Sequence, residues 1–146
     1  MKQRTYVMVK PEFANNPEII EEIKRRILNA GFKIVEESFI QYDMPHAKRH
    51  YKGLIEKFPE LGVYITGDKA FGMVVEGENV IDTIHNEMAG KTKNPAPGTI
   101  RYDIPYMFGL PLRVTENVVH SSDSEETAEY EIEIFEELAN MNQKEM

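Results

Sequence analysis

The sequence predicts an α/β protein of the α+β sandwich type, with the ferredoxin-like order βαββαβ, in which helices cover an antiparallel sheet. Segments rich in β-branched and aromatic residues alternate with segments whose apolar residues recur at helical spacing, as Ile19, Ile23 and Ile27 do. The connections between these segments are short. The chain has 146 residues, a length that suits one compact core. We therefore expect a single domain over residues 1–146.

Four segments have the composition of short strands. The first ends at Lys10 and Pro11, because proline cannot donate a hydrogen bond to a neighbouring strand. The predicted strands cover residues 5–9, 32–42, 71–75 and 117–119.

Four other segments are predicted to be helices. The first begins at Asn16 and Pro17, a capping residue followed by a proline in the first turn, and it ends near Gly31. The predicted helices cover residues 16–31, 45–51, 79–88 and 124–138. We expect residues 91–106 to be mostly loop, because they contain three prolines. Residues 140–146 are polar and are expected to form a frayed tail.

Composition and charge exclude several classes of function. The formal net charge of −8 argues against binding of bulk nucleic acid. The chain has no cysteine, so disulfides and thiolate chemistry are excluded. No apolar run is long enough to span a bilayer, and the first residues lack the apolar stretch of a signal peptide. We expect a cytoplasmic protein with no nucleic-acid or membrane partner.

The most informative segment covers residues 117–124. A short apolar strand ends at His120, small hydroxyl residues follow, and a helix then begins. A neutral imidazole is a good nucleophile near pH 7, and a helix N-terminus offers unpaired amides and a positive dipole end to a phosphate. Glu131, farther along this helix, could reach back to orient the ring. The alternative is a lone histidine at a strand end, followed by an ordinary helix cap.

Two cationic residues stand beside rigid turns. Lys10 lies at the end of the first strand, next to Pro11, where it could contact a phosphate. Arg101 closely follows Pro97 and Gly98, and a guanidinium binds phosphate oxygens with several donors at once. Taken singly, each is better explained as a solvated surface side chain.

His46 and His50 are four residues apart on a predicted helix, a spacing that can bind a metal ion. They are accompanied by no HExxH motif and no clear third ligand, so we expect no metal ligand among the protein's own side chains. The sequence also lacks GxxxxGK[ST] and GxGxxG, so neither a P-loop nor a dinucleotide-binding fold is predicted.

In combination and in order, these segments resemble the nucleoside diphosphate kinase family. The run NVVHSSDS is similar to the family's signature around its active histidine and is quite specific. The other matching segments are the run VMVKPE, His50 with Tyr51, and residues 71–77, 97–101 and 127–132. The resemblance implies a ferredoxin-like fold, a Mg²⁺-nucleotide substrate and a ping-pong reaction through a phosphorylated His120.

The resemblance also implies a role for each matching residue. His120 would be the catalytic nucleophile, with Ser122 and Glu131 supporting its ring and Lys10 neutralising phosphate charge. Phe58 would stack on the base, Tyr51 would lie by the transferred phosphate, and His85 stands where the family usually has an arginine. The implied nucleotide-binding residues are Lys10, Tyr51, Phe58, His85, Thr92, Arg101 and Asn117. Mg²⁺ would be held mainly through the nucleotide phosphates.

The implied partners are nucleoside di- and triphosphates, and the implied assembly is a homo-oligomer, commonly a hexamer and sometimes a tetramer or dimer. The alternatives are a nucleotide-binding regulatory relative with impaired phosphotransfer, or a purely structural protein. The segment over residues 108–116 is longer than the family's usual connection. Arg113 within it either replaces a family arginine or points to solvent.

Overall fold

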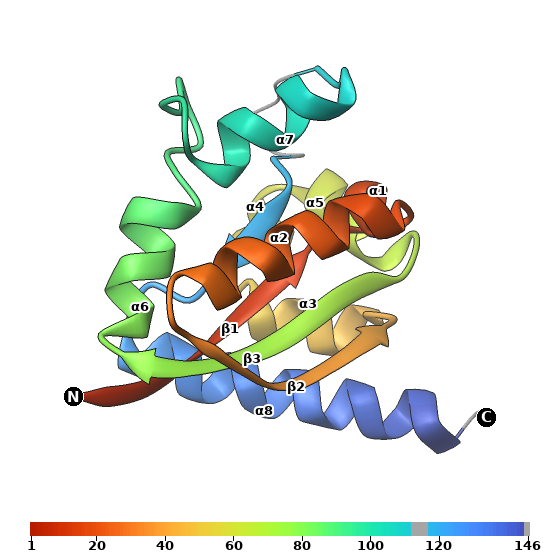
Figure 1. Cartoon of the computed structure of the whole chain (residues 1–146). Coiled ribbons are helices and arrows are strands. Elements are labelled where there is room, and N and C mark those ends of the chain that lie inside the picture. Colours follow the sequence, from red (N-terminus) through yellow and green to blue (C-terminus); the bar gives the residue numbers. More distant parts are fainter. Residues whose placement is uncertain (112–116, 145–146) are drawn as a thin grey trace.

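Four strands form one antiparallel sheet in the order β2-β3-β1-β4, which confirms the predicted ferredoxin-like fold (Figure 1). The computed structural model describes residues 1–111 and 117–144. The strands are β1 (Lys2–Val9), β2 (Lys33–Ile40), β3 (Ala70–Glu78) and β4 (Val119–Ser121). β1 is a central strand that pairs with β3 on one side and with the short edge strand β4 on the other.

Helices connect and cover these strands. They are α1 (Pro11–Ala14), α2 (Pro17–Asn29), α3 (Met44–His50), α4 (Leu54–Lys57), α5 (Pro59–Thr66), α6 (Val80–Asp82), the π-helix η1 (Thr83–Met88), α7 (Ile100–Phe108) and α8 (Glu125–Lys144). None of the helices in the described part of the chain is both long enough and apolar enough to cross a membrane.

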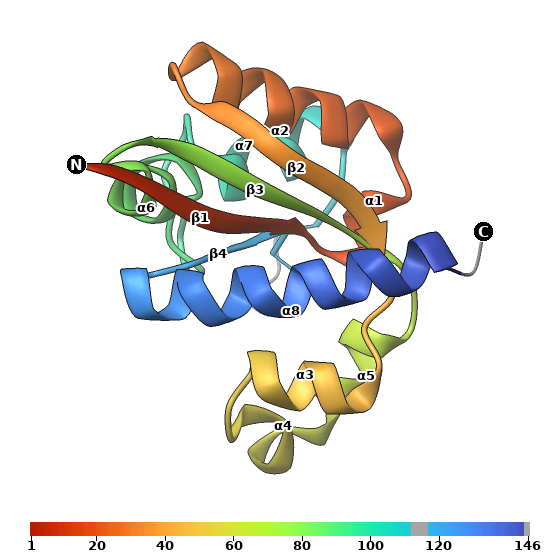
Figure 2. The same ribbon diagram turned by 90° about the horizontal axis from the view of Figure 1, so that it is seen from below.

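The alternating side chains of β1 divide the core into two halves. Val7 and Val9 pack with α2, α6 and η1 on one face. Tyr6 and Met8 pack with α3, α5 and α8 on the other. Figure 2 shows α2 and α8 on opposite sides of the sheet. The sheet is therefore buried on both faces, and its edge beyond β1 carries β4 with the candidate nucleophile.

The prediction that residues 91–106 are mostly loop was wrong for their second half. Residues Ile100–Phe108 form α7, although Pro105 lies inside the helix. Ile100 and Ile104 are four residues apart and both are buried in the core. Asp103 accepts hydrogen bonds from Arg26 and from the amide of Gly98, which fastens the helix at its start. These tertiary contacts outweigh the local signal of the prolines.

Two predicted boundaries also shift. The last strand begins at Val119 rather than residue 117, because Val118 has a φ of 80° and so cannot continue an extended strand. The last helix was expected to end near Leu138, but it continues to Lys144, so most of the segment expected to be a frayed tail is helical. Arg113 lies outside the described residues, as do all of residues 112–116 of its segment.

Candidate active site

His120 lies in the middle of β4, opposite Met8 of β1. The two residues before it form a tight turn, in which the amide of Val119 donates to the carbonyl of Asn117 at 3.0 Å. Val118 is central to this turn, with its φ of 80°, a strained conformation for a β-branched residue. The carbonyl of Val118 accepts from the amide of Lys10 at 2.8 Å. The strained turn therefore joins the candidate nucleophile to the candidate lysine.

Glu131 orients the His120 ring. Its Oε1 lies 2.9 Å from Nε2 of His120 and accepts a hydrogen bond from Oγ of Ser122 at 2.7 Å. Ser122 is itself held by β1, because its Oγ accepts from the amide of Tyr6 and its own amide donates to the carbonyl of Tyr6. The contact with Glu131 occupies Nε2 and leaves Nδ1 as the ring nitrogen that can react. The sequence-based grouping of His120, Ser122 and Glu131 is thus present as a connected set.

The surroundings keep His120 neutral. Burial, and then the charges of Lys10 and Arg101, lower the pKa of His120 to about 3. Its side chain is still 22% exposed, so a ligand can reach it. Burial also raises the pKa of Glu131 above its usual value. A neutral, accessible imidazole with one nitrogen fixed by a carboxylate is the arrangement that nucleophilic catalysis requires.

Lys10 and Arg101 form a local cationic cluster beside His120. Nζ of Lys10 donates to Oδ1 of Asn117 at 2.7 Å, and burial lowers the pKa of Lys10 to about 7, with a further contribution from Arg101. Arg101 donates to the carbonyls of Gly90 and Val119, and burial lowers its pKa to about 10. Neither behaves as the solvated surface side chain that each resembled in the sequence alone.

One pocket of about 390 Å³ collects these groups, a size typical of small-molecule sites. Seven predicted site residues besides His120 line it, and so does His50 of the histidine pair. The seven are Lys10, Tyr51, His85, Thr92, Arg101, Asn117 and Glu131. Ser122 lies behind Glu131. Phe58 is not among the described lining residues. It is half exposed at the junction of α4 and α5, four residues after Leu54, which does line the pocket.

The pocket also contains residues that the sequence did not single out for the site, among them Lys52, Ser121, Asp123, Thr127 and Tyr130. Thr127 lies four residues before Glu131 and three before Tyr130 on α8, so helical spacing could have found Thr127 from Glu131 and then Tyr130 from Thr127. Lys52 could not have been found this way, because it comes from another element and lies over the Tyr130 ring at 3.8 Å.

Some amides at the start of α8 already have side-chain acceptors. The amides of Asp123 and Ser124 donate to Oγ1 of Thr127, and the amide of Thr127 donates to Oγ of Ser124. Three amides at the helix start are therefore already used. The helix dipole still points its positive end at the pocket.

The predicted helical pair of histidines separates in space. His46 lies 2.6 Å from Asp43 and 3.1 Å from Glu137, on the outer side of α3. His50 is buried and faces Glu131 and His120. The two histidines therefore do not share a ligand.

A ferredoxin-like sheet with a neutral histidine, a lysine and an arginine around one pocket is suited to an enzyme that handles phosphate groups. The family described as nucleoside diphosphate kinase matches residues 3–140. The chain belongs to the nucleoside diphosphate kinase family, and it is an enzyme, a phosphotransferase.

Similar proteins support this assignment at the level of sequence and structure. A nucleoside diphosphate kinase of Bacillus cereus is 42% identical over 137 residues, covering 91% of this chain and 87% of the relative. One of Methanocaldococcus jannaschii is 41% identical over 141 residues, covering 92% and 94%. The crystal structure of the Aquifex aeolicus nucleoside diphosphate kinase superposes with a TM-score of 0.76 at 26% identity, covering 92% of this chain and 95% of that one.

Proposed function

We propose that the protein transfers the γ-phosphate of a nucleoside triphosphate, typically ATP, to a nucleoside diphosphate through a phosphohistidine at His120. The observation that carries this proposal is the orientation of His120. Glu131 occupies its Nε2, which leaves Nδ1 to act within a pocket that also contains Lys10 and Arg101. Membership of the kinase family supplies the class of reaction.

In the first half of the reaction, Nδ1 of His120 attacks the γ-phosphorus, and the bond from that phosphorus to the β–γ bridging oxygen breaks. The nucleoside diphosphate leaves with both bonding electrons. In the second half, a terminal oxygen of another nucleoside diphosphate attacks the phosphohistidine, and the ring nitrogen leaves. Positive charge forms on the imidazole each time the phosphate is attached, and the carboxylate of Glu131 stabilises it through Nε2.

The pocket supplies the charge neutralisation on which phosphoryl transfer depends. Lys10 and Arg101 would bind phosphate oxygens, and Thr92 and His85 line the same pocket. Tyr51 would lie beside the transferred group and Asn117 near the sugar. This cluster explains how a chain of net charge −8 can bind a polyphosphate.

Phe58, outside the pocket lining, and Asp123, within it, would serve the base and the metal ion. Phe58 lies at the α4–α5 junction, where its exposed ring would stack on the base. Stacking without fixed polar contacts to the base fits a broad range of nucleotides. Mg²⁺ would arrive with the triphosphate and neutralise its charge. The exposed carboxylate of Asp123 lines the pocket and fits this role, since Mg²⁺ is commonly held by phosphates and one or two carboxylates.

We also propose that the protein works in the cytoplasm as one domain per subunit of a homo-oligomer, with a hexamer favoured over a tetramer or dimer. Light scattering coupled to size-exclusion chromatography measures the mass directly. A monomer of 16.9 kDa at micromolar concentration would contradict the assembly and leave the phosphotransfer proposal in place.

The phosphohistidine is tested by incubating the protein with γ-labelled ATP and Mg²⁺, removing free nucleotide and then adding unlabelled GDP. We expect label on the protein that is acid-labile and alkali-stable, and that passes to GDP as labelled GTP. The variant His46→Gln, which changes a histidine outside the pocket, is the matched control and should label normally. Binding of ATP without any label would instead identify a nucleotide-binding regulatory relative.

Replacing His85 with arginine should lower the KM for ATP three- to tenfold, roughly 1 kcal/mol of binding free energy. His85 lines the pocket and its Nδ1 lies 3.0 Å from Oγ of Ser121. A guanidinium at this position adds a permanent charge and several donors for phosphate oxygens. Steady-state kinetics of wild type, His85→Arg and His85→Ala measure the effect. An unchanged KM in both variants would show that residue 85 does not contact the phosphates.

Lys10 should make nucleotide binding take up a proton above neutral pH. Burial and Arg101 hold its pKa at about 7, so at pH 8 most nucleotide-free molecules have a neutral Lys10. Phosphate charge favours the ammonium form and raises this pKa, so binding of Mg·ADP at pH 8 should take up about one proton. Calorimetry in buffers of different ionisation enthalpy measures this uptake. The variant Lys10→Arg stays charged throughout, and an equal uptake in this variant would show that another group is responsible.

A further inference from the structure

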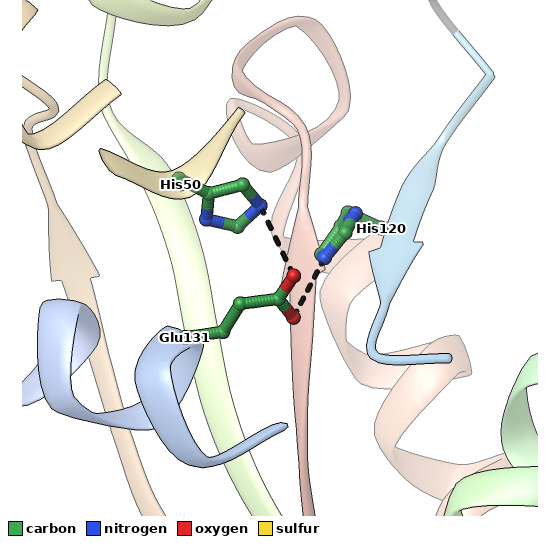
Figure 3. A group of neighbouring side chains, drawn as sticks. All are labelled: His50, His120 and Glu131. Carbon is green, nitrogen blue, oxygen red and sulfur yellow. Dashed lines mark hydrogen bonds and ion pairs between the residues drawn. The ribbon is translucent and has the colours of Figure 1, made fainter. Parts of the chain in front are cut away.

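Three side chains from three different elements bring metal-ligating atoms together at the wall of the pocket. His50 comes from the end of α3, Glu131 from α8 and His120 from β4, and Figure 3 shows both imidazole rings pointing at the carboxylate of Glu131. One ligand atom from each of the three lies within 4.8 Å of those of the other two. Two histidines and one carboxylate form a common ligand set for zinc.

His50 contributes a ring nitrogen whose position is otherwise unexplained. Its side chain is only 1% exposed, and its Nε2 has no hydrogen-bond partner among the described residues. The nearest carboxylate oxygen, Oε2 of Glu131, is 3.8 Å away, which is too far for a hydrogen bond. Buried polar atoms almost always have partners, so this nitrogen is poised for a ligand that lies between the two side chains.

Hydrogen bonds hold the His50 ring and the Glu131 carboxylate in place, as is usual for metal ligands. Nδ1 of His50 lies 3.1 Å from the hydroxyl of Tyr42, which lies 3.0 Å from the hydroxyl of Tyr6. Ser122 holds the Glu131 carboxylate at Oε1. A ligating histidine generally has its second nitrogen bonded in this way, and a ligating carboxylate is generally hydrogen-bonded as well.

Protonation and access also suit a metal ion. Burial lowers the pKa of both His50 and His120 to about 3, so both rings are neutral at pH 7. The lone pair of His50 is on Nε2 when its Nδ1 donates to Tyr42, and His120 offers a lone pair at Nε2 once its ring proton moves from Nε2 to Nδ1. All three residues line the pocket, so water can occupy a fourth position on the ion. Zinc sites with three protein ligands keep such an open position.

We propose that His50, His120 and Glu131 form a binding site for Zn²⁺ or a similar borderline divalent cation, and that the occupied site prevents phosphorylation of His120. The bound ion takes Nε2 of His120 and separates it from Glu131. The ring then loses the carboxylate that stabilises its positive charge, and the cation repels further positive charge on the imidazole. Metal binding stands by itself, whereas the inhibition rests on the proposed phosphohistidine.

The site requires only small movements. Two atoms that each lie about 2.0–2.1 Å from a tetrahedral zinc ion are about 3.3–3.4 Å apart. The 3.8 Å between Nε2 of His50 and Oε2 of Glu131 must therefore shorten by roughly 0.5 Å when the ion binds. The charges of Lys10 and Arg101 oppose a cation, which limits the affinity. Mg²⁺ prefers six oxygen ligands, so the cation of the nucleotide does not compete for this site.

Cobalt(II) is the direct probe, because it replaces zinc and its visible absorption is intense only at low coordination number. The nucleotide-free protein is titrated with Co²⁺ and then with Zn²⁺. We expect a visible spectrum that saturates at one Co²⁺ per chain and disappears when Zn²⁺ is added. The absence of such a spectrum would overturn the proposal.

Two variants locate the ion. His50→Phe keeps an aromatic ring against Tyr6, Tyr42 and Tyr51 but removes the ligand, and Glu131→Gln removes the carboxylate charge. Each should weaken Co²⁺ binding at least about tenfold. His46→Gln, on the outer side of the same helix, should bind like the wild type. Circular dichroism checks that each variant folds. If His50→Phe does not fold, Co²⁺ binding by Glu131→Gln tests the location of the site by itself. An unchanged spectrum in the folded variants would refute the site.

The inhibition is measured separately by labelling with γ-labelled ATP in the presence of Zn²⁺. Label should be lost from the wild type and return when a chelator is added, and His50→Phe should need at least about tenfold more Zn²⁺ for the same loss. Equal sensitivity of the two proteins would show that zinc acts elsewhere. A wild type that never labels, even without zinc, would refute the proposed function but not the cobalt result.

Discussion

Replacing His120 with alanine should lower the rate of phosphate transfer between nucleotides by at least about 10³-fold and abolish labelling of the protein. The variant loses the atom that forms the bond to phosphorus, and no neighbouring group in the described pocket can substitute for it. The side chain of His50 is only 1% exposed and its Nε2 faces Glu131, so a γ-phosphorus cannot reach it, and the amine of Lys10 is hydrogen-bonded to Asn117. His85 is the remaining imidazole, and its Nδ1 is directed to Ser121.

The same variant should still bind nucleotide, because Lys10 and Arg101 are unchanged. A ligand that binds only the folded state raises the melting temperature, so Mg·ADP should stabilise His120→Ala as it does the wild type. The measurement is the exchange rate from ATP to GDP, with thermal unfolding beside it. Transfer at more than a tenth of the wild-type rate in a folded, nucleotide-binding His120→Ala would rule out the phosphohistidine.

Replacing Phe135 with alanine should lower the free energy of unfolding by about 3–5 kcal/mol. Phe135 lies on the buried face of α8 and is 1% exposed. Its ring centroid is 5.5 Å from that of Tyr6, and its edge fills the space over Gly72 so closely that a Cβ there would be 2.6 Å from Cδ1. The variant removes most of this side chain from a fully packed region, and the rigid sheet cannot move to fill the cavity.

Urea unfolding followed by circular dichroism measures the loss, with Glu129→Ala as the matched control. Glu129 is exposed on the same helix, so its replacement should change the free energy by less than about 0.5 kcal/mol. An effect below about 1 kcal/mol for Phe135→Ala, at equal m-value, would mean that α8 is not fixed by this contact. Because α8 carries Glu131, we expect the phosphotransfer rate to fall with the stability.

Much of the fold could be predicted because its signals are local. The apolar repeat of α2 and the prolines and caps at the helix starts act within a few residues, and they predicted the βαββαβ order correctly. The prediction failed for α7, where the burial of Ile100 and Ile104 and the contacts of Asp103 come from other elements. It also failed at Val118, whose left-handed backbone is held by a hydrogen bond to Lys10 from another segment.

The residues of the candidate site likewise fall into a group that is local in the sequence and a group that only the fold brings together. His120, Ser122 and Glu131 lie within twelve residues of one another, so a strand, a turn and one helix bring them together. Lys10 and Arg101 were each indistinguishable from surface side chains until the sheet and α7 placed them beside His120. Lys52 and Asp123 were missed, since no local pattern marks them as parts of a pocket wall.

The sequence alone determined the order of strands and helices, the family and the identity of the candidate nucleophile, because periodicity and short motifs are properties of neighbouring residues. Only the tertiary structure decided which charges surround His120, and therefore that its imidazole is neutral and that Lys10 titrates near pH 7. The tertiary structure also decided that His50 points toward Glu131 and does not pair with His46. Burial and the distances between charges depend on residues far apart in the chain, and only the packed fold fixes them.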